Sequence, residues 1–166
     1  MAAAAETTLS ERLAAAGYIA GWKAVRHLPP RAASALFNAG ADIASDKGRG
    51  ADMLRRNLTR VVGAENVTRA LVRDSMRSYA RYWLEAFRLP QMAGEPELNA
   101  TLSAGVSGRE HLDAAVARGK GVVLTLPHTG NWDMAGTWLA ENYGGFTTVA
   151  ERLEPEALFD AFVMFR

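Results

Sequence analysis

His128 and Asp133, in the stretch LPHTGNWDMAG from Leu126 to Gly136, are the residues of this chain best suited to acid–base chemistry. Histidine titrates near neutral pH, and a carboxylate bonded to one ring nitrogen fixes the tautomer and stabilises the imidazolium. The other nitrogen can then take a proton from a substrate hydroxyl, which typically accelerates a reaction by about 10²–10⁴-fold. The two residues are therefore a candidate general base and its orienting acid.

The five-residue spacing restricts where the two side chains can meet. Residues five apart on one regular helix differ by about 140° in direction. His128 must therefore precede a helix whose first turn holds Asp133, with Gly130 allowing a sharp turn between them. A purely structural explanation also fits, because the helix dipole stabilises an Asp in a first turn and a His at a strand end can bond to backbone. The spacing leaves both explanations open.

The flanking patterns predict a strand, a turn and a helix. Residues 121–127, GVVLTLP, form a continuous apolar run that is typical of a buried parallel strand. The expected elements that follow are a helix at 130–144, a strand at 146–151 and a helix from 154. This alternation indicates an α/β fold with a mostly parallel sheet and helices on both faces, whose active sites lie at the carboxyl ends of strands.

Residues 91–166 are thus expected to form the first portion of an α/β core. They begin with a looser connection at 91–108 that could include a short strand, followed by a short helix opened by a capping box of Ser107 and Glu110 and closed by Gly119. Two parallel strands are too few for a stable sheet. The sheet is therefore expected to be incomplete at the C-terminus, as in the N-terminal part of a larger protein.

Residues 1–90 are expected to be a helical, membrane-facing part of the same continuous domain. Their predicted helices span 10–28, 29–45, 50–63 and 66–90. Asn66 is expected to cap the fourth helix and Pro90 to end it. Arginines recur along that helix at every fourth position, namely Arg69, Arg73, Arg77 and Arg81. Such a stripe is either a solvated face or a contact for the phosphates of a cofactor or lipid.

Charge and apolarity point to an anionic surface as a partner. The net charge is +1, but residues 1–90 hold 14 Lys and Arg against 8 Asp and Glu, whereas residues 91–166 hold 5 against 10. A basic half favours anionic partners. The first helix is either packed into the core or laid on a membrane with Tyr18 and Trp22 at the headgroups. The sequence contains no run of about 18 apolar residues, so it predicts no membrane-spanning helix.

The sequence does not contain the residues that several other kinds of active or binding site require. The 166 residues include no Cys, which excludes disulfides and thiolate metal sites and favours a reducing compartment. No G-x-S-x-G nucleophile elbow and no P-loop occur, and His111 with Asp113 fits a solvated helix better than a metal site. We expect no metal and no permanently bound cofactor.

The motif and its flanks resemble a known family. LPHTGNWDMAG resembles the H-x₄-D/E motif of the bacterial lipid A lauroyl/myristoyl acyltransferases, and the similarity extends from about Tyr18 to Arg166. The stretches SYARYWLEAFRLP and NYGGFTTVAERLEPEALF resemble the branch of that family that acylates a mannose on a phosphatidylinositol mannoside. The family's catalytic region continues beyond the position of Arg166.

The resemblance implies transfer of an acyl group, palmitoyl in this branch, from acyl-CoA to the mannose 6-hydroxyl. His128 is then the general base and Asp133 its partner, with no acyl-enzyme, no metal and no nucleic acid involved. The enzyme would be peripheral at the cytoplasmic face of the plasma membrane. The alternatives are a lipid A-type acceptor, or a peripheral lipid-binding fragment without catalysis.

Three further residues are candidates for substrate binding. Glu151 and Arg152 follow the second expected strand, where they could face the same crevice or form an exposed ion pair. Arg166 matches a position at which the family has an arginine near the acyl donor or the sugar.

Overall fold

The computed structural model describes residues 9–46, 49–149, 151–152, 156, 159–160 and 163. Within these residues the chain forms seven α-helices and one 3₁₀ turn, η1. Their bounds are α1 Leu9–His27, α2 Pro30–Asp46, α3 Arg49–Val62, η1 Ala64–Asn66, α4 Arg69–Met92, α5 Pro96–Gly105, α6 Arg109–Ala117 and α7 Trp132–Tyr143. The four expected helices of the first 90 residues are thus confirmed.

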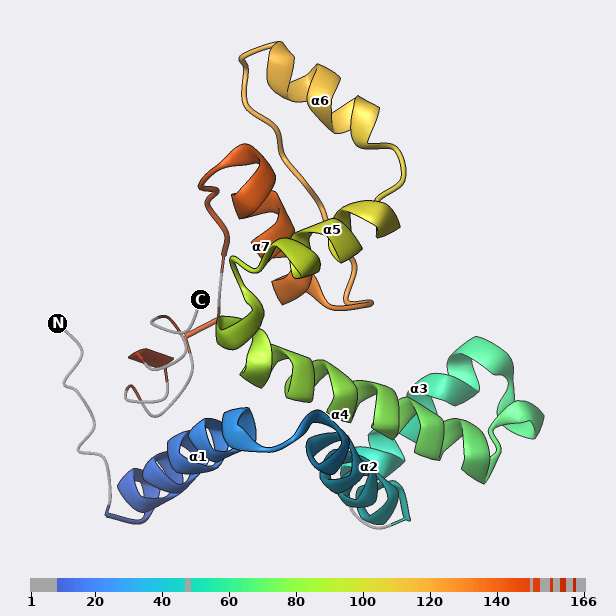
Figure 1. The fold of residues 1–166 in the computed structure, drawn as a ribbon. Coiled ribbons are helices and arrows are strands. Elements are labelled where there is room, and N and C mark those ends of the chain that lie inside the picture. The colour runs from blue at the N-terminus through green and yellow to red at the C-terminus, as the bar shows by residue number, and fades with distance from the viewer. Residues whose placement is uncertain are drawn as a thin grey trace, which may run out of the picture.

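The long helix α4 organises the molecule (Figure 1). The helices α1, α2 and α3 pack against it, α2 most extensively, while α7 contacts it and also packs on α5. The end of α1 is fixed by Arg88 of α4, whose Nη1 donates to the Leu28 carbonyl at 2.7 Å. Helices α1, α2 and α3 and the helix α7, which follows the turn that carries His128, are therefore all attached to α4. Helices α1 to α4 are called the helical front below.

Small residues let α2 approach α4 closely. Ala33 and Ala41 of α2 and Val72 of α4 are almost fully buried. Nearer the other end of α4, Trp22 of α1 is buried and its ring lies 5.3 Å from that of Phe87. The packed interpretation of the first helix therefore holds for Trp22, whereas the side chain of Tyr18 lies outside the described part of the structure.

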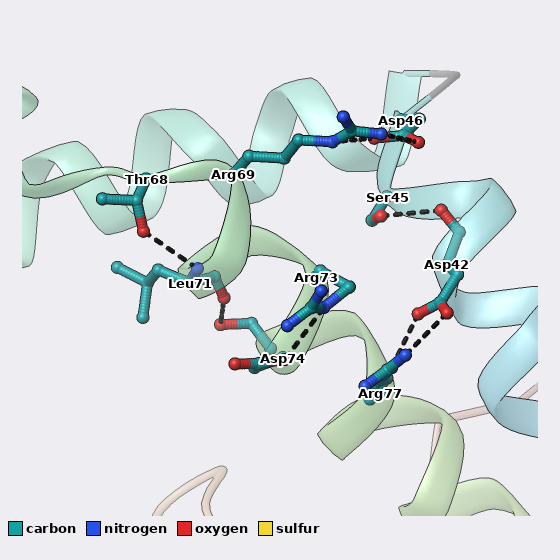
Figure 2. A network of polar contacts seen from close by, with 10 residues as sticks. Asp42, Ser45, Asp46, Thr68, Arg69, Leu71, Arg73, Asp74 and Arg77 are labelled. Atoms are coloured by element: carbon teal, nitrogen blue, oxygen red, sulfur yellow. Dashed lines mark hydrogen bonds and ion pairs between the residues drawn. The ribbon is translucent and has the colours of Figure 1, made fainter.

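The arginine stripe of α4 joins helices (Figure 2). Arg77 forms two hydrogen bonds to the carboxylate of Asp42 on α2, at 2.6 and 2.7 Å, and Arg69 forms two to Asp46, at 2.9 and 2.6 Å. These bonds hold the pKa of each of the two carboxyls below its ordinary value. Half of the stripe thus pairs with carboxylates of α2, and one of these arginines, Arg69, also keeps 80% of its side chain exposed to solvent.

The predicted parallel sheet is wrong for the described residues, in which no strand occurs. Residues 121–127 and 144–149 are irregular and solvent-exposed, with Val123 90% and Val149 98% accessible. An apolar run suits a strand only where neighbouring backbone accepts its hydrogen bonds, and neither segment has such a neighbour among the residues that the structure describes. In this half, α7 instead packs on α5 and on α4.

Local signals explain the smaller errors. The connection at 91–108 contains α5, whose Pro96 lies at the start of the helix, where proline needs no N–H partner. Thr68, not Asn66, caps α4 by accepting the Leu71 N–H at 3.1 Å. Pro90 lies inside α4.

The expected capping box is also wrong. Gly108 is the N-cap of α6, and no side chain bonds to that end of the helix. The predicted closing glycine is confirmed: Gly119 follows the C-cap Arg118 with a φ of 66° and donates its N–H to the Val116 carbonyl at 2.9 Å.

Replacing Asp42 with Asn should lower the thermal unfolding midpoint at neutral pH. The ordinary pKa of this carboxyl is 3.8 and Arg77 lowers it in the folded state, so its stabilising contribution is present above about pH 4 and is lost as the pH falls through the folded-state pKa. Circular dichroism melts from pH 7 to pH 3 should show the variant and the parent chain converging at the acidic end.

The matched control is Asp74→Asn, because the partner of Asp74 is the neighbouring Arg73 on the same helix. A melting difference for Asp42→Asn that is unchanged by acid, or one that Asp74→Asn equals, would contradict the role of Asp42 in joining α2 to α4.

Candidate active site

His128 lies on the exposed segment that precedes α7. All residues from 121 to 130 are solvent-exposed, and the chain bends at His128. Gly130 has a φ of 68°, a left-handed conformation that glycine adopts without strain, so the expected turn is confirmed. The imidazole ring contacts Trp132 edge to face, with 5.5 Å between ring centroids. The ring is therefore accessible to a substrate on one side and supported on another.

Asn131 begins α7 and fixes its direction. Its Oδ1 accepts the backbone N–H groups of Asp133 and Met134, both at 3.1 Å. Its Nδ2 donates to Oε2 of Glu85 on α4 at 2.9 Å. One side chain thus caps α7 and attaches it to the long helix.

Asp133 is buried in the first turn of α7, with 9% of its surface accessible. Its Oδ2 accepts the hydroxyl of Tyr82 on α4 at 2.9 Å, in a buried hydrogen bond. A buried carboxylate needs such donors, because an unpaired charge away from water is strongly unfavourable.

The structure does not join His128 directly to Asp133. No hydrogen bond or ion pair links the two side chains in the described part of the chain: His128 contacts the ring of Trp132, whereas Asp133 accepts the hydroxyl of Tyr82. Trp132 connects them indirectly. Its ring contacts His128 and lies 4.8 Å from the ring of Tyr82, whose hydroxyl binds Asp133. The two residues share one local constellation, and their direct pairing stays a prediction.

No described polar contact links Glu151 or Arg152 to this constellation. Arg152 pairs with Glu156, with Nε 3.0 Å from Oε2, and lies over the ring of Phe159. This pair differs from the expected one, which joined Arg152 to Glu151, and the proposed roles of both residues in substrate binding stay predictions. Glu151 is exposed, no described polar contact links it to His128, and Arg166 lies outside the described residues.

The far end of α7 is held by α5 and α6. Glu141 accepts the side-chain N–H of Asn99 on α5 at 2.8 Å, and Tyr143 donates its hydroxyl to Asp113 of α6. The hydrogen bond to Asp113 raises the pKa of Tyr143. Gly144 then ends the helix with a φ of 85°, as the sequence predicts.

An open apolar groove of about 370 Å³ lies between α2 and α4, within the range of ligand sites. Its lining is aromatic or aliphatic throughout: Phe37, Gly40, Ala41, Ala44, Met76, Tyr79, Ala80, Trp83 and Phe87.

Residues 6–166 match the family of bacterial lipid A biosynthesis acyltransferases. The chain belongs to this family. It is 53% identical over 152 residues to a phosphatidylinositol mannoside acyltransferase of Mycolicibacterium smegmatis, and 50% and 49% identical over 151 residues to proteins of that name from two strains of Mycobacterium tuberculosis. These matches cover 90% of the chain and 49%, 47% and 47% of the relatives, so the chain spans about half their length.

In this member of the acyltransferase family, three residues around the motif were not predicted from the sequence to belong to the site. Tyr82 and Glu85 are three apart and so lie on one face of α4, a spacing that a helical plot would reveal. Asn131 belongs to the residue types that favour an N-cap, which was the available signal. Their contacts with α7 join positions more than 45 residues apart, which local patterns do not encode.

Replacing Asn131 with Ala should reduce the free energy of unfolding by about 0.5–2 kcal/mol, because α7 loses its cap. Urea unfolding measures the loss, and hydrogen exchange at the amides of Asp133 and Met134 should accelerate. Asn131→Asp keeps the capping oxygen and loses the donor to Glu85, so it should retain slow exchange at both amides. Equal exchange in the parent chain and Asn131→Ala would show that the cap does not hold this turn.

Proposed function

We propose that this chain carries the His-Asp part of a membrane-associated O-acyltransferase. The enzyme moves a fatty acyl group, palmitoyl, from acyl-CoA to the 6-hydroxyl of a mannose on a phosphatidylinositol mannoside. It acts as a peripheral protein at the cytoplasmic face of the plasma membrane. Acyl-CoA is a co-substrate in this scheme, and the reaction as written needs no resident cofactor.

His128 acts as the general base. The mannose oxygen attacks the thioester carbonyl carbon while the imidazole takes the hydroxyl proton, the carbon–sulfur bond breaks, and the CoA thiolate leaves and recovers a proton. The negative charge of Asp133 stabilises the imidazolium. Hydrogen bonds of catalytic groups often tighten only when substrate is bound, so the scheme has His128 and Asp133 pair in the substrate complex.

The observation that carries the proposal is the match to three relatives named phosphatidylinositol mannoside acyltransferase, at 49–53% identity over 90% of this chain. The family match includes both His128 and Asp133. The exposed imidazole and the buried carboxylate in the first turn of the following helix are consistent with these roles. The apolar groove between α2 and α4 offers a surface suited to a fatty acyl chain.

Membrane attachment is proposed through the helical front. On α2, Leu36 and Ile43 are two turns apart, 58% and 69% exposed, and therefore point in the same direction. Arg31 in the first turn of α2 is exposed as well. Apolar side chains flanked by basic ones favour an interfacial helix. No helix among the described residues has the length and apolarity that a transmembrane span requires.

Replacing His128 with Ala should reduce acyl transfer by about 10²–10⁴-fold and leave the fold intact, because the removed ring is exposed. Palmitoyl-CoA and phosphatidylinositol mannoside are supplied in vesicles, and the acylated lipid is quantified by mass spectrometry. His111→Ala removes another exposed histidine, on α6, and should transfer at the parent rate.

Retained transfer in folded His128→Ala would refute the general-base role. A panel that includes lipid A-type acceptors separates the two acceptor classes. Vesicle binding without transfer to any acceptor would favour the alternative of a lipid-binding fragment without catalysis.

Ile43→Ser should weaken binding to vesicles that contain phosphatidylinositol by roughly tenfold. The substitution removes an exposed apolar side chain that would otherwise be buried among the lipids. Co-sedimentation measures the binding, which should also weaken as salt rises. Val61→Ser on α3 is the matched control, since Val61 is 81% exposed on a different helix. Equal losses in both variants, or binding that is insensitive to salt, would contradict the assignment of α2 as the attachment surface.

A further inference from the structure

Tyr82 is a buried residue of α4 whose hydroxyl reaches α7, 51 positions further along the chain. It donates to Oδ2 of Asp133 at 2.9 Å, and this bond is shielded from water. A hydrogen bond to a charged group is stronger than one between neutral groups, and stronger inside a protein than in water. The bond therefore restricts where the carboxylate of Asp133 can lie.

The ring of Tyr82 acts on the other half of the site. It lies 4.8 Å from the ring of Trp132, which in turn lies 5.5 Å from the imidazole of His128. Aromatic pairs at such separations are attractive beyond the area that they bury. One side chain thus supports Asp133 through its hydroxyl and His128 through a single intervening ring.

A second contact, between Glu85 and Asn131, also holds the start of α7 on α4. Glu85 lies one turn after Tyr82 on the same face of α4 and accepts the side chain of Asn131 at 2.9 Å. Residues 131 and 133 are therefore both fixed to α4, at two points one helical turn apart. Two points of attachment fix the direction of the first turn of α7 as well as its position.

We propose that Tyr82 is a positioning residue of the acyltransferase site, which holds Asp133 and His128 in their relative placement without touching the substrates. This inference rests on the proposed function. A misplacement of catalytic groups by about 1 Å can slow a reaction by about 10²-fold, so a residue with this role affects turnover more than substrate binding.

The test compares Tyr82→Phe, which removes the hydroxyl and keeps the ring, with the parent chain in the acyl-transfer assay. We expect kcat to fall by roughly tenfold and KM for palmitoyl-CoA to stay within about twofold. Tyr143→Phe is the control, because it also removes a tyrosine–aspartate hydrogen bond, but at the far end of α7. It should keep the parent kcat.

A double-mutant cycle tests whether Tyr82 acts through Asp133. In the Asp133→Asn background, Tyr82→Phe should change kcat by less than about twofold, because the group that it positions is already altered. Equal effects of Tyr82→Phe in both backgrounds, or a parent-like kcat in the single variant, would overturn the proposal.

A measurement without substrate separates this inference from the proposed function. The chain has three histidines, so their ring proton resonances can be followed individually, with His27 and His111 as internal references. Tyr82→Leu, which removes the ring that contacts Trp132, should shift the resonance of His128 and leave the other two unmoved. If the parent chain transfers no acyl group, the proposed function fails for this chain, and this spectrum still decides the role of Tyr82. An unmoved His128 resonance would refute it.

Discussion

The buried hydrogen bond from Tyr82 to Asp133 is the contact on which the candidate site depends. Without that donor, the carboxylate would lose a bond in a place that water scarcely reaches. The bond also fixes the first turn of α7 on α4, and α4 is fixed on α2 by the ion pairs of Arg69 and Arg77. The position of an exposed histidine is therefore set by contacts that begin in the helical front of the molecule.

This dependence gives the helical front a second role. Its basic and apolar surfaces are the proposed attachment to a lipid bilayer, while its longest helix supports the proposed catalytic turn. Tyr82 and Glu85 face α7 from the same helix whose Trp83 and Phe87 line the apolar groove. A substrate chain in that groove would lie along the helix that holds Asp133. Lipid binding and catalysis would then share one structural element.

The sequence predicted the features that depend on local patterns. Apolar periodicity located the first four helices, and Gly130 and Gly144 marked the turn and the helix end because both positions need a positive φ. The spacing of His128 and Asp133 correctly implied a histidine that precedes a helix and an aspartate in its first turn. The resemblance to a family, carried by that motif and its flanks, is confirmed.

The features that it missed depend on distant contacts. Residues 121–127 are apolar enough for a strand, but pairing decides whether a strand forms, and they remain exposed here. The sequence leaves the role of the α4 arginines open, because the partners of Arg77 and Arg69 lie on α2, 35 and 23 positions earlier in the chain. In the local sequence pattern, Tyr82 does not differ from other aromatic residues of a helix. Asn131 likewise does not differ from other polar residues of a turn. Their importance comes from partners 51 and 46 positions away.

The proposed acyl transfer to a mannolipid can be measured on this chain itself. The parent chain is incubated with palmitoyl-CoA and phosphatidylinositol mannoside, and free thiol and palmitoylated lipid are measured in the same samples. The protein contains no cysteine, so all free thiol comes from CoA. We expect equal amounts of the two products, and tandem mass spectrometry should locate the acyl group on a mannose. Thiol release without acylated lipid, or neither product from the folded chain, would contradict the proposal.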